Sequence, residues 1–109
     1  MADEIAVFVT ADDLELARRI AEELVQRRLV ACVNIVPGIE SIYRWHGALQ
    51  RDREVLLIIK SSRHRFAEIE ALVKELHTYQ VPEVIALPID HGSQAYLDWL
   101  QESVAKEND

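Results

Sequence analysis

Residues 4–10 read Glu-Ile-Ala-Val-Phe-Val-Thr and are followed directly by Ala-Asp-Asp at residues 11–13. The first stretch is rich in β-branched and aromatic residues and lacks a helical period, which predicts a strand. The hydroxyl and carboxylate groups of residues 10–13 can cap the N-terminus of a helix, and Asp12 is the expected cap. The chain is therefore expected to open with a strand that leads directly into a helix.

The same signals divide the rest of the chain. Apolar residues spaced three and four apart, with charged residues on the opposite side, indicate amphipathic helices, whereas apolar runs without that period indicate strands. The expected elements are a helix over residues 12–29, a strand over residues 31–45 with a bulge or kink at Pro37-Gly38, a turn at His46-Gly47, a strand over residues 53–60, a helix capped by Ser61-Ser62, a strand over residues 83–89, and a helix capped by Ser93.

This order of elements is β-α-β-β-α-β-α, which is typical of a split βαβ or ferredoxin-like α+β fold with an extra C-terminal helix. Right-handed crossovers then predict an antiparallel sheet in the order 4-1-3-2, with the first two helices on one face. The length of 109 residues fits a single domain over residues 1–109.

The second face of this sheet is expected to be apolar as well. Ala6 and Phe8 in the first strand, and Leu56 and Ile58 in the third, point to the face opposite that of their apolar neighbours at residues 5, 7, 9, 55, 57 and 59, so both faces are apolar. An exposed apolar area of this size is rare on a monomer, so we expect several copies of the chain to bury it together. The alternative is that the C-terminal helix covers this face alone.

Composition and charge limit the classes of partner. The chain has 12 Lys and Arg against 19 Asp and Glu, a net charge of −7, which disfavours nucleic acid and membrane surfaces as partners. Cys32 is the only cysteine, so no disulfide can form within the chain. The N-terminal Met-Ala-Asp-Glu is acidic, unlike a secretory signal, and predicts a cytoplasmic protein.

Reactive side chains fall into two groups at opposite ends of the predicted sheet. Cys32 and Lys60 lie at one end, where a neighbouring ammonium favours a thiolate, although a lone strand cysteine more often packs as a small apolar residue. His77 and Tyr79 lie at the other end, with Thr10, Trp45, His46 and Glu54. No spacing typical of a metal site within one chain occurs, so any such site is expected to be shared between subunits.

Several rare residues in fixed order give the chain a resemblance to a known family. The sequence from residue 7 to residue 103 resembles the CutA divalent-cation tolerance family. The matching features are residues 29–34 (Leu-Val-Ala-Cys-Val-Asn), Pro37-Gly38, residues 41–45 (Ser-Ile-Tyr-Arg-Trp) with Gly47, residues 54–61, His77, Tyr79, Pro82-Glu83, and Tyr96-Leu97 with Trp99.

The resemblance implies a ferredoxin-like homotrimer, with a link to copper and other divalent ions. The positions that match the shared pocket are Cys32, Lys60 and Tyr79 for a ligand and His77 for a metal ion. Some bacterial members carry Cys and His where this chain has Val9 and Leu76. Because thiolate and imidazole are the preferred copper ligands, metal binding here is expected to be weak.

These observations predict a cytoplasmic homotrimer that binds a divalent metal ion or small ligand at clefts between subunits and is not an enzyme. Two alternatives stay open. One is a structural, interaction or signalling trimer for which no ion matters, and the other is a thiol-dependent enzyme that uses Cys32 and Lys60.

Overall fold

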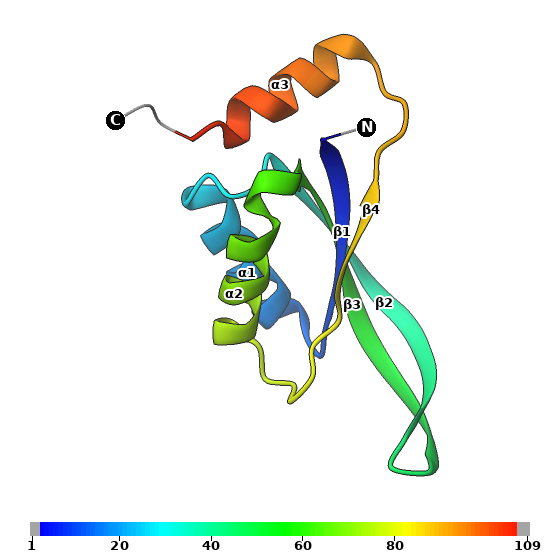
Figure 1. Cartoon of the computed structure of the whole chain (residues 1–109). Helices are drawn as coiled ribbons and strands as arrows, with labels where there is room; N and C mark the ends of the chain where they lie inside the picture. Colours follow the sequence, from blue (N-terminus) through cyan, green and yellow to red (C-terminus); the bar gives the residue numbers. More distant parts are fainter. Residues whose placement is uncertain (1–2, 107–109) are drawn as a thin grey trace.

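The computed structural model describes residues 3–106 and has the predicted α+β architecture (Figure 1). The elements follow one another in the predicted order. They are β1 (Glu4–Ala11), α1 (Leu14–Gln26), β2 (Cys32–Trp45), β3 (Ala48–Ser62), a short 3-10 turn η1 (Arg63–Arg65), α2 (Phe66–Leu76), β4 (Val84–Pro88) and α3 (Gln94–Val104).

The strands form one antiparallel sheet in the order β2-β3-β1-β4. This is the predicted 4-1-3-2 order read from the other edge, so the topology is confirmed. The helices α1 and α2 lie against one face of the sheet, and α3 lies across one end of it (Figure 1). The hydrophobic core fills the space between that helix pair and the sheet. Its fully buried side chains include Val7, Val9, Leu57 and Ile59 from the sheet and Ile20, Leu24, Ile69 and Val73 from the helices.

Helix α1 begins one residue later than the expected cap implies. Asp13, not Asp12, is the N-cap, and its Oδ1 accepts a hydrogen bond of 2.7 Å from the backbone N–H of Leu16. Asp13 has an extended backbone, which places its short side chain beside the free N–H groups of the first turn. The prediction of Asp12 as the cap was therefore wrong by one position.

Replacing Asp13 with alanine is expected to lower the free energy of unfolding by about 1 kcal/mol, because the N–H of Leu16 loses its acceptor. Asp13→Asn retains an acceptor oxygen and should keep most of the stability. Urea unfolding measures both variants against Asp12→Ala, which removes an equal charge from the exposed neighbouring position. Equal losses for Asp12→Ala and Asp13→Ala would contradict the assignment.

Helix α1 also ends earlier than the expected residue 29. Arg28 has a positive φ of 59°, and the N–H of Leu29 donates to the carbonyl of Leu24 at 3.1 Å while that of Arg28 donates to Val25 at 3.0 Å. This pair of bonds is a Schellman motif, which closes a helix through one residue in the left-handed conformation. Leu24 and Leu29 are both buried, so packing holds the arginine in a conformation that usually favours glycine.

The start of the second helix differs from the prediction. Ser62 makes no capping bond with its side chain, because β3 continues to this residue through its pairing with Glu4. The hydroxyl of Ser61 donates instead to the carbonyl of Leu29 at 2.6 Å, and that of Ser62 donates to the carbonyl of Asp3 at 3.3 Å. The two buried serines therefore join separate segments rather than cap α2.

The β2–β3 hairpin is longer than expected, since β3 begins at Ala48 rather than near residue 53. The predicted turn is confirmed, because His46 and Gly47 have φ values of 51° and 78°, as the tightest hairpin turns require. The predicted bulge is confirmed by a register shift between Val36 and Ile39. The hairpin extends beyond the rest of the sheet (Figure 1).

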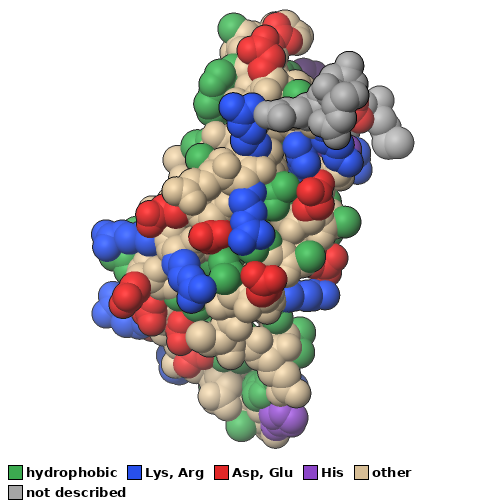
Figure 2. Space-filling view, turned by 90° about the vertical axis from the view of Figure 1, so that its left-hand side faces the viewer, with side chains coloured by type: hydrophobic (Ala, Val, Ile, Leu, Met, Phe, Trp, Pro, Cys, Tyr) green, Lys and Arg blue, Asp and Glu red, His purple; other side chains and the backbone are tan. Residues whose placement is uncertain are grey.

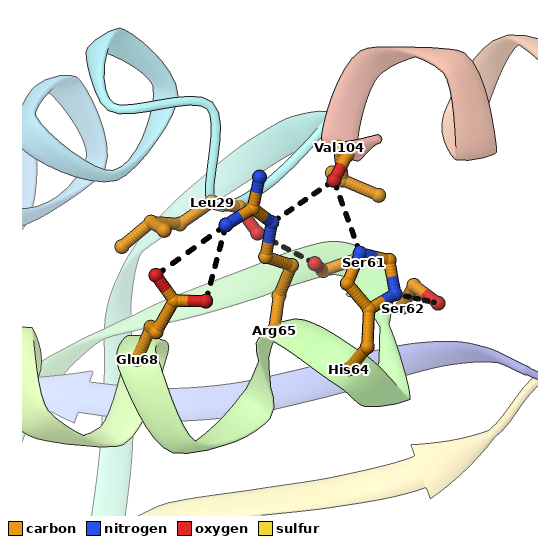
Figure 3. A network of polar contacts seen from close by, with 7 residues as sticks. All are labelled: Leu29, Ser61, Ser62, His64, Arg65, Glu68 and Val104. Carbon is orange, nitrogen blue, oxygen red and sulfur yellow. Dashed lines mark hydrogen bonds and ion pairs between the residues drawn. The ribbon is translucent and has the colours of Figure 1, made fainter. Parts of the chain in front are cut away.

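The C-terminal end of α3 is held by polar contacts (Figure 3). The carbonyl of Val104 accepts hydrogen bonds from Arg65 Nε at 2.9 Å and from His64 Nε2 at 3.1 Å. Arg65 is only 9% exposed, and its Nη1 also donates to both oxygens of Glu68 at 3.1 and 3.3 Å. Because Gln101 binds Glu4, α3 is fixed near the start of β1.

The second face of the sheet stays largely uncovered within the chain. Phe8 pairs with Ile58 on one side and with Ile85 on the other, so these three side chains share this face. Ile85 is 50% exposed and Leu87 is 44% exposed, which shows that α3 does not cover the face alone. By contrast, the helical side of the molecule carries interspersed acidic and basic side chains (Figure 2).

Candidate functional site

The site begins with a cavity of about 350 Å³ beside the loop that joins α2 to β4, which we call the acidic pocket. Three elements meet there: the end of β1, the β2–β3 hairpin and the α2–β4 loop. Of the residues that the sequence places at this end of the sheet, four line the cavity and a fifth, His77, adjoins it. The lining residues are Thr10, Tyr43, Trp45, Glu54, Tyr79, Gln80, Val81 and Glu83.

Glu54 and Tyr79 form the central polar contact of the acidic pocket. The Tyr79 hydroxyl donates to Glu54 Oε2 at 2.6 Å, and Glu54 is only 8% exposed. Burial, together with the hydrogen bond to Glu54, raises the pKa of Tyr79, so its phenol stays protonated at neutral pH and acts as a donor. Burial also raises the pKa of Glu83, and the charge of Glu54 adds to this effect.

His77 ends helix α2 and lies beside the pocket, as predicted. Its Nε2 is 2.6 Å from the carbonyl oxygen of Thr10. Because a carbonyl can only accept, Nε2 carries the proton, and Nδ1 accepts the backbone N–H of Tyr79 at 3.0 Å. Both ring nitrogens therefore have partners within the chain, and a metal ion at His77 would have to replace one of them.

Cys32 and Lys60 lie at the other end of the sheet, as predicted. They are direct partners in the β2–β3 register, and the Lys60 ammonium donates to Asn34 Oδ1. Burial and the neighbouring Cys32 raise the pKa of Tyr96 in α3, which adds a phenol to this group. The three residues Cys32, Lys60 and Tyr96 thus form a second polar group near the start of α3.

The two groups are too far apart to form one site within the chain. Lys60 pairs with Ala6 of β1, whereas Thr10 pairs with Leu56. The four residue steps from Ala6 to Thr10 span roughly 13 Å along the strand. Cys32 and Lys60, which the resemblance assigns to one shared pocket with His77 and Tyr79, therefore lie at the opposite end of the sheet from them within one chain, as the sequence predicts.

The structure contains no preformed metal site in the part of the chain that it describes. Residues 3–106 hold no group of three or more His, Cys, Asp or Glu side chains that could bind an ion together. Val9, which stands where some relatives of the resembled family have a cysteine, is fully buried in the core, and Leu76 packs against that core. Neither position offers a ligand.

The family model for the CutA1 divalent ion tolerance protein matches residues 5–103. The chain belongs to the CutA1 divalent ion tolerance family. A CutA divalent-cation tolerance protein from Thermus thermophilus is 52% identical over 100 residues, which cover 92% of this chain and 97% of that protein. A chloroplastic CutA protein from Arabidopsis thaliana is 50% identical over 99 residues, which cover 91% of this chain and 54% of that protein.

Solved structures confirm the CutA1 fold. The Thermus thermophilus protein superposes with a TM-score of 0.92 at 51% identity, covering 94% of this chain and 99% of that one. CutA1 from Oryza sativa gives a TM-score of 0.93 at 46% identity, with 97% of each chain covered. The relatives differ in stated location, because the Arabidopsis thaliana protein is chloroplastic whereas a solved relative from Archaeoglobus fulgidus is described as periplasmic. No helix within residues 3–106 is long and apolar enough to cross a bilayer.

Sequence reasoning missed three features of the CutA1 chain's acidic pocket. It did not find the contribution of Tyr43, or that of residues 80–81, or the hydrogen bond between Glu54 and Tyr79. One signal was present, since Glu54 opens an otherwise apolar run at residues 55–59 and so had to be near-buried. Its contact with Tyr79, which lies 25 positions further along the chain, depends on how the α2–β4 loop folds back.

Proposed function

We propose that this CutA1 chain works as a cytoplasmic homotrimer in divalent-cation tolerance and binds a metal ion, such as copper, or a small ligand weakly at clefts between subunits. Its relatives are named for divalent-cation tolerance rather than for a reaction, which supports a non-catalytic role. The observation that carries the proposal is the separation of the candidate residues into two distant groups on one chain.

Contact between subunits supplies what one chain lacks. The open face with Phe8, Ile58 and Ile85 is apolar and partly exposed, so association of identical chains gains free energy by burying it. In a closed ring, one end of each sheet can face the opposite end of its neighbour. Cys32 and Lys60 of one subunit can then complete a site with His77 and Tyr79 of the next.

Binding at such a cleft is expected to be weak for a structural reason. An ion that takes His77 as a ligand must displace the Thr10 carbonyl from Nε2 or the Tyr79 N–H from Nδ1. Losing a buried hydrogen bond costs about 1–3 kcal/mol. The free energy of metal binding at His77 is therefore less favourable, by that amount, than at a histidine with a free ring nitrogen.

Titration with Cu²⁺ is expected to show binding tighter than about millimolar, and His77→Ala is expected to weaken it about tenfold because imidazole is a preferred copper ligand. Isothermal titration calorimetry measures both. His91→Ala is the control, because His91 is 90% exposed and its ring pairs with Asp90 rather than with a residue of either group. Equal weakening in His77→Ala and His91→Ala would contradict the role of His77.

The same titration decides between this proposal and a trimer that serves only as an interaction or structural module. That second function is favoured by the two occupied nitrogens of His77 and by the lack of a three-ligand group within residues 3–106. If the assembled wild-type protein binds neither Cu²⁺ nor Zn²⁺ more tightly than about millimolar, the interaction function replaces the metal function. Thiol chemistry at Cys32 stays a prediction.

A further inference from the structure

The acidic pocket contains a carboxylate that is incompletely compensated. Glu54 is 8% exposed, and among the described residues only the Tyr79 hydroxyl donates to it, at Oε2. The second oxygen, Oε1, has no donor within residues 3–106, and Glu54 lines the cavity. None of the lining residues carries a positive charge. A nearly buried carboxylate with one neutral donor favours a cation that enters the cavity.

The pocket walls favour an organic cation over a bare divalent ion. Mg²⁺ and Ca²⁺ need six or more oxygen ligands in a close shell, whereas this cavity offers carboxylates from Glu54 and Glu83 only. Three aromatic residues, Tyr43, Trp45 and Tyr79, also line it. Aromatic faces attract ammonium and guanidinium groups, which shed water more easily than divalent ions.

We propose that the acidic pocket of this chain binds the ammonium group of a small primary alkylamine. The pocket uses Glu54, Glu83 and the aromatic rings, and of the residues assigned to the metal cleft it shares only Tyr79. An ammonium group has three N–H donors, for which Glu54 Oε1, a Glu83 carboxylate oxygen and the Thr10 hydroxyl are available acceptors.

The geometry at Glu54 selects ammonium over guanidinium. A guanidinium binds a carboxylate best through two parallel hydrogen bonds, which need both oxygens of one carboxylate. Tyr79 already occupies Oε2 of Glu54, so a single oxygen is left for the ligand. A compact ammonium needs only one oxygen from each carboxylate and can take the others from separate residues.

Shape and composition set the rest of the ligand. The cavity of about 350 Å³ is at the small end of the usual range for ligand pockets, so the ligand has few heavy atoms beyond its ammonium group. Val81 and the aromatic rings give an apolar wall for a short alkyl chain. The raised pKa of Glu83, which burial and the charge of Glu54 cause, agrees with excess negative charge in the cavity.

The test compares n-butylamine with butan-1-ol, which has the same chain length and no charge. Binding is followed by the shift of the Trp45 indole N–H signal in ¹H–¹⁵N spectra of the full chain, with EDTA present so that a metal ion at the cleft plays no part. We expect butylamine to bind about tenfold more tightly than butanol. Equal affinities, or tighter binding of butylguanidinium or of Ca²⁺ added without EDTA, would overturn the proposal.

Matched variants locate the site. Glu54→Gln is expected to weaken butylamine binding about tenfold, whereas Glu40→Gln makes the same charge change on the same hairpin outside the pocket and should leave it unchanged. Because a buried substitution can disturb folding, Trp45→Leu gives a second reading. This variant lacks the reporting indole, so isothermal titration calorimetry measures butylamine binding in all four variants. Trp45 is 43% exposed and should be required, while Trp99→Leu, at 45% exposure on α3, should bind as the wild type does. Binding retained in Trp45→Leu and Glu54→Gln would refute the assignment.

Discussion

The variant Phe8→Glu is expected to leave the folded chain as a monomer. Its particle mass should fall about threefold from that of the assembly we propose, to that of one 12.5 kDa chain. Phe8 lies on the central strand β1, between Ile58 and Ile85 on the open face. Burying a carboxylate among these apolar side chains without a partner costs several kcal/mol in effective terms, so association becomes unfavourable.

The fold of the separated subunit is expected to survive this change. Phe8 is half-buried in the isolated chain, and its neighbours Val7 and Val9 carry the core on the other face. Multi-angle light scattering at micromolar concentration gives the mass, and circular dichroism checks the fold. The control is Val25→Glu, which places the same charge on the outer side of α1 at a residue that is 45% exposed.

Two results would count against the assembly. If the wild type already has the mass of a single chain, no shared cleft exists and the metal site proposed there is lost with it. If Phe8→Glu keeps the wild-type mass, the open face is not the contact between subunits. The alkylamine pocket is lined by residues of one chain, so butylamine binding can be measured in either case.

The second large effect is expected at Arg65, whose replacement by methionine should lower the free energy of unfolding by about 2–3 kcal/mol. Arg65 Nε donates to the carbonyl of Val104, and its Nη1 holds Glu68 (Figure 3). Methionine retains much of the apolar stem but leaves the last carbonyl of α3 to His64 alone. Val104 is fully buried, and the lost bond weakens the hold on this buried end of the helix. We therefore expect α3 to detach before the rest of the chain unfolds.

Urea unfolding measures the loss of stability, and hydrogen exchange at the α3 amides shows whether that helix opens first. Arg27→Met is the matched control, since Arg27 forms an exposed ion pair with Glu23 at 3.0 Å and such pairs contribute about 0.5 kcal/mol or less. Both variants must be compared at one protein concentration, because association contributes to apparent stability. Similar losses for Arg65→Met and Arg27→Met would contradict the anchoring role of Arg65.

Prediction from the sequence succeeded where the signal is local. The turn at His46-Gly47 and the bulge after Val36 follow from residue types that favour those backbone conformations. It was less accurate at helix starts, because a serine or aspartate can cap only if the strand before it has ended. Ser62 was misassigned for this reason, since its pairing with Glu4 extends β3 by one more residue pair.

The candidate site shows the same division between local and long-range information. The sequence placed Thr10, Glu54, His77 and Tyr79 at one end of the sheet, because strand direction fixes which residues share an end. It gave no indication that the carbonyl of Thr10, 67 positions earlier in the chain, would accept a hydrogen bond from Nε2 of His77. A hydrogen bond of this kind depends on the exit angle of the α2–β4 loop, which no local pattern encodes.

The sequence by itself determined the element order, the sheet topology and the presence of apolar residues on both faces, because hydrophobic periodicity and crossover handedness act on the chain directly. Only the tertiary structure decided which polar groups have partners. Within residues 3–106 it left Glu54 Oε1 without a donor and both nitrogens of His77 occupied. The physical reason is that hydrogen bonds need atoms within about 3 Å, a precision that arises only when distant segments pack together.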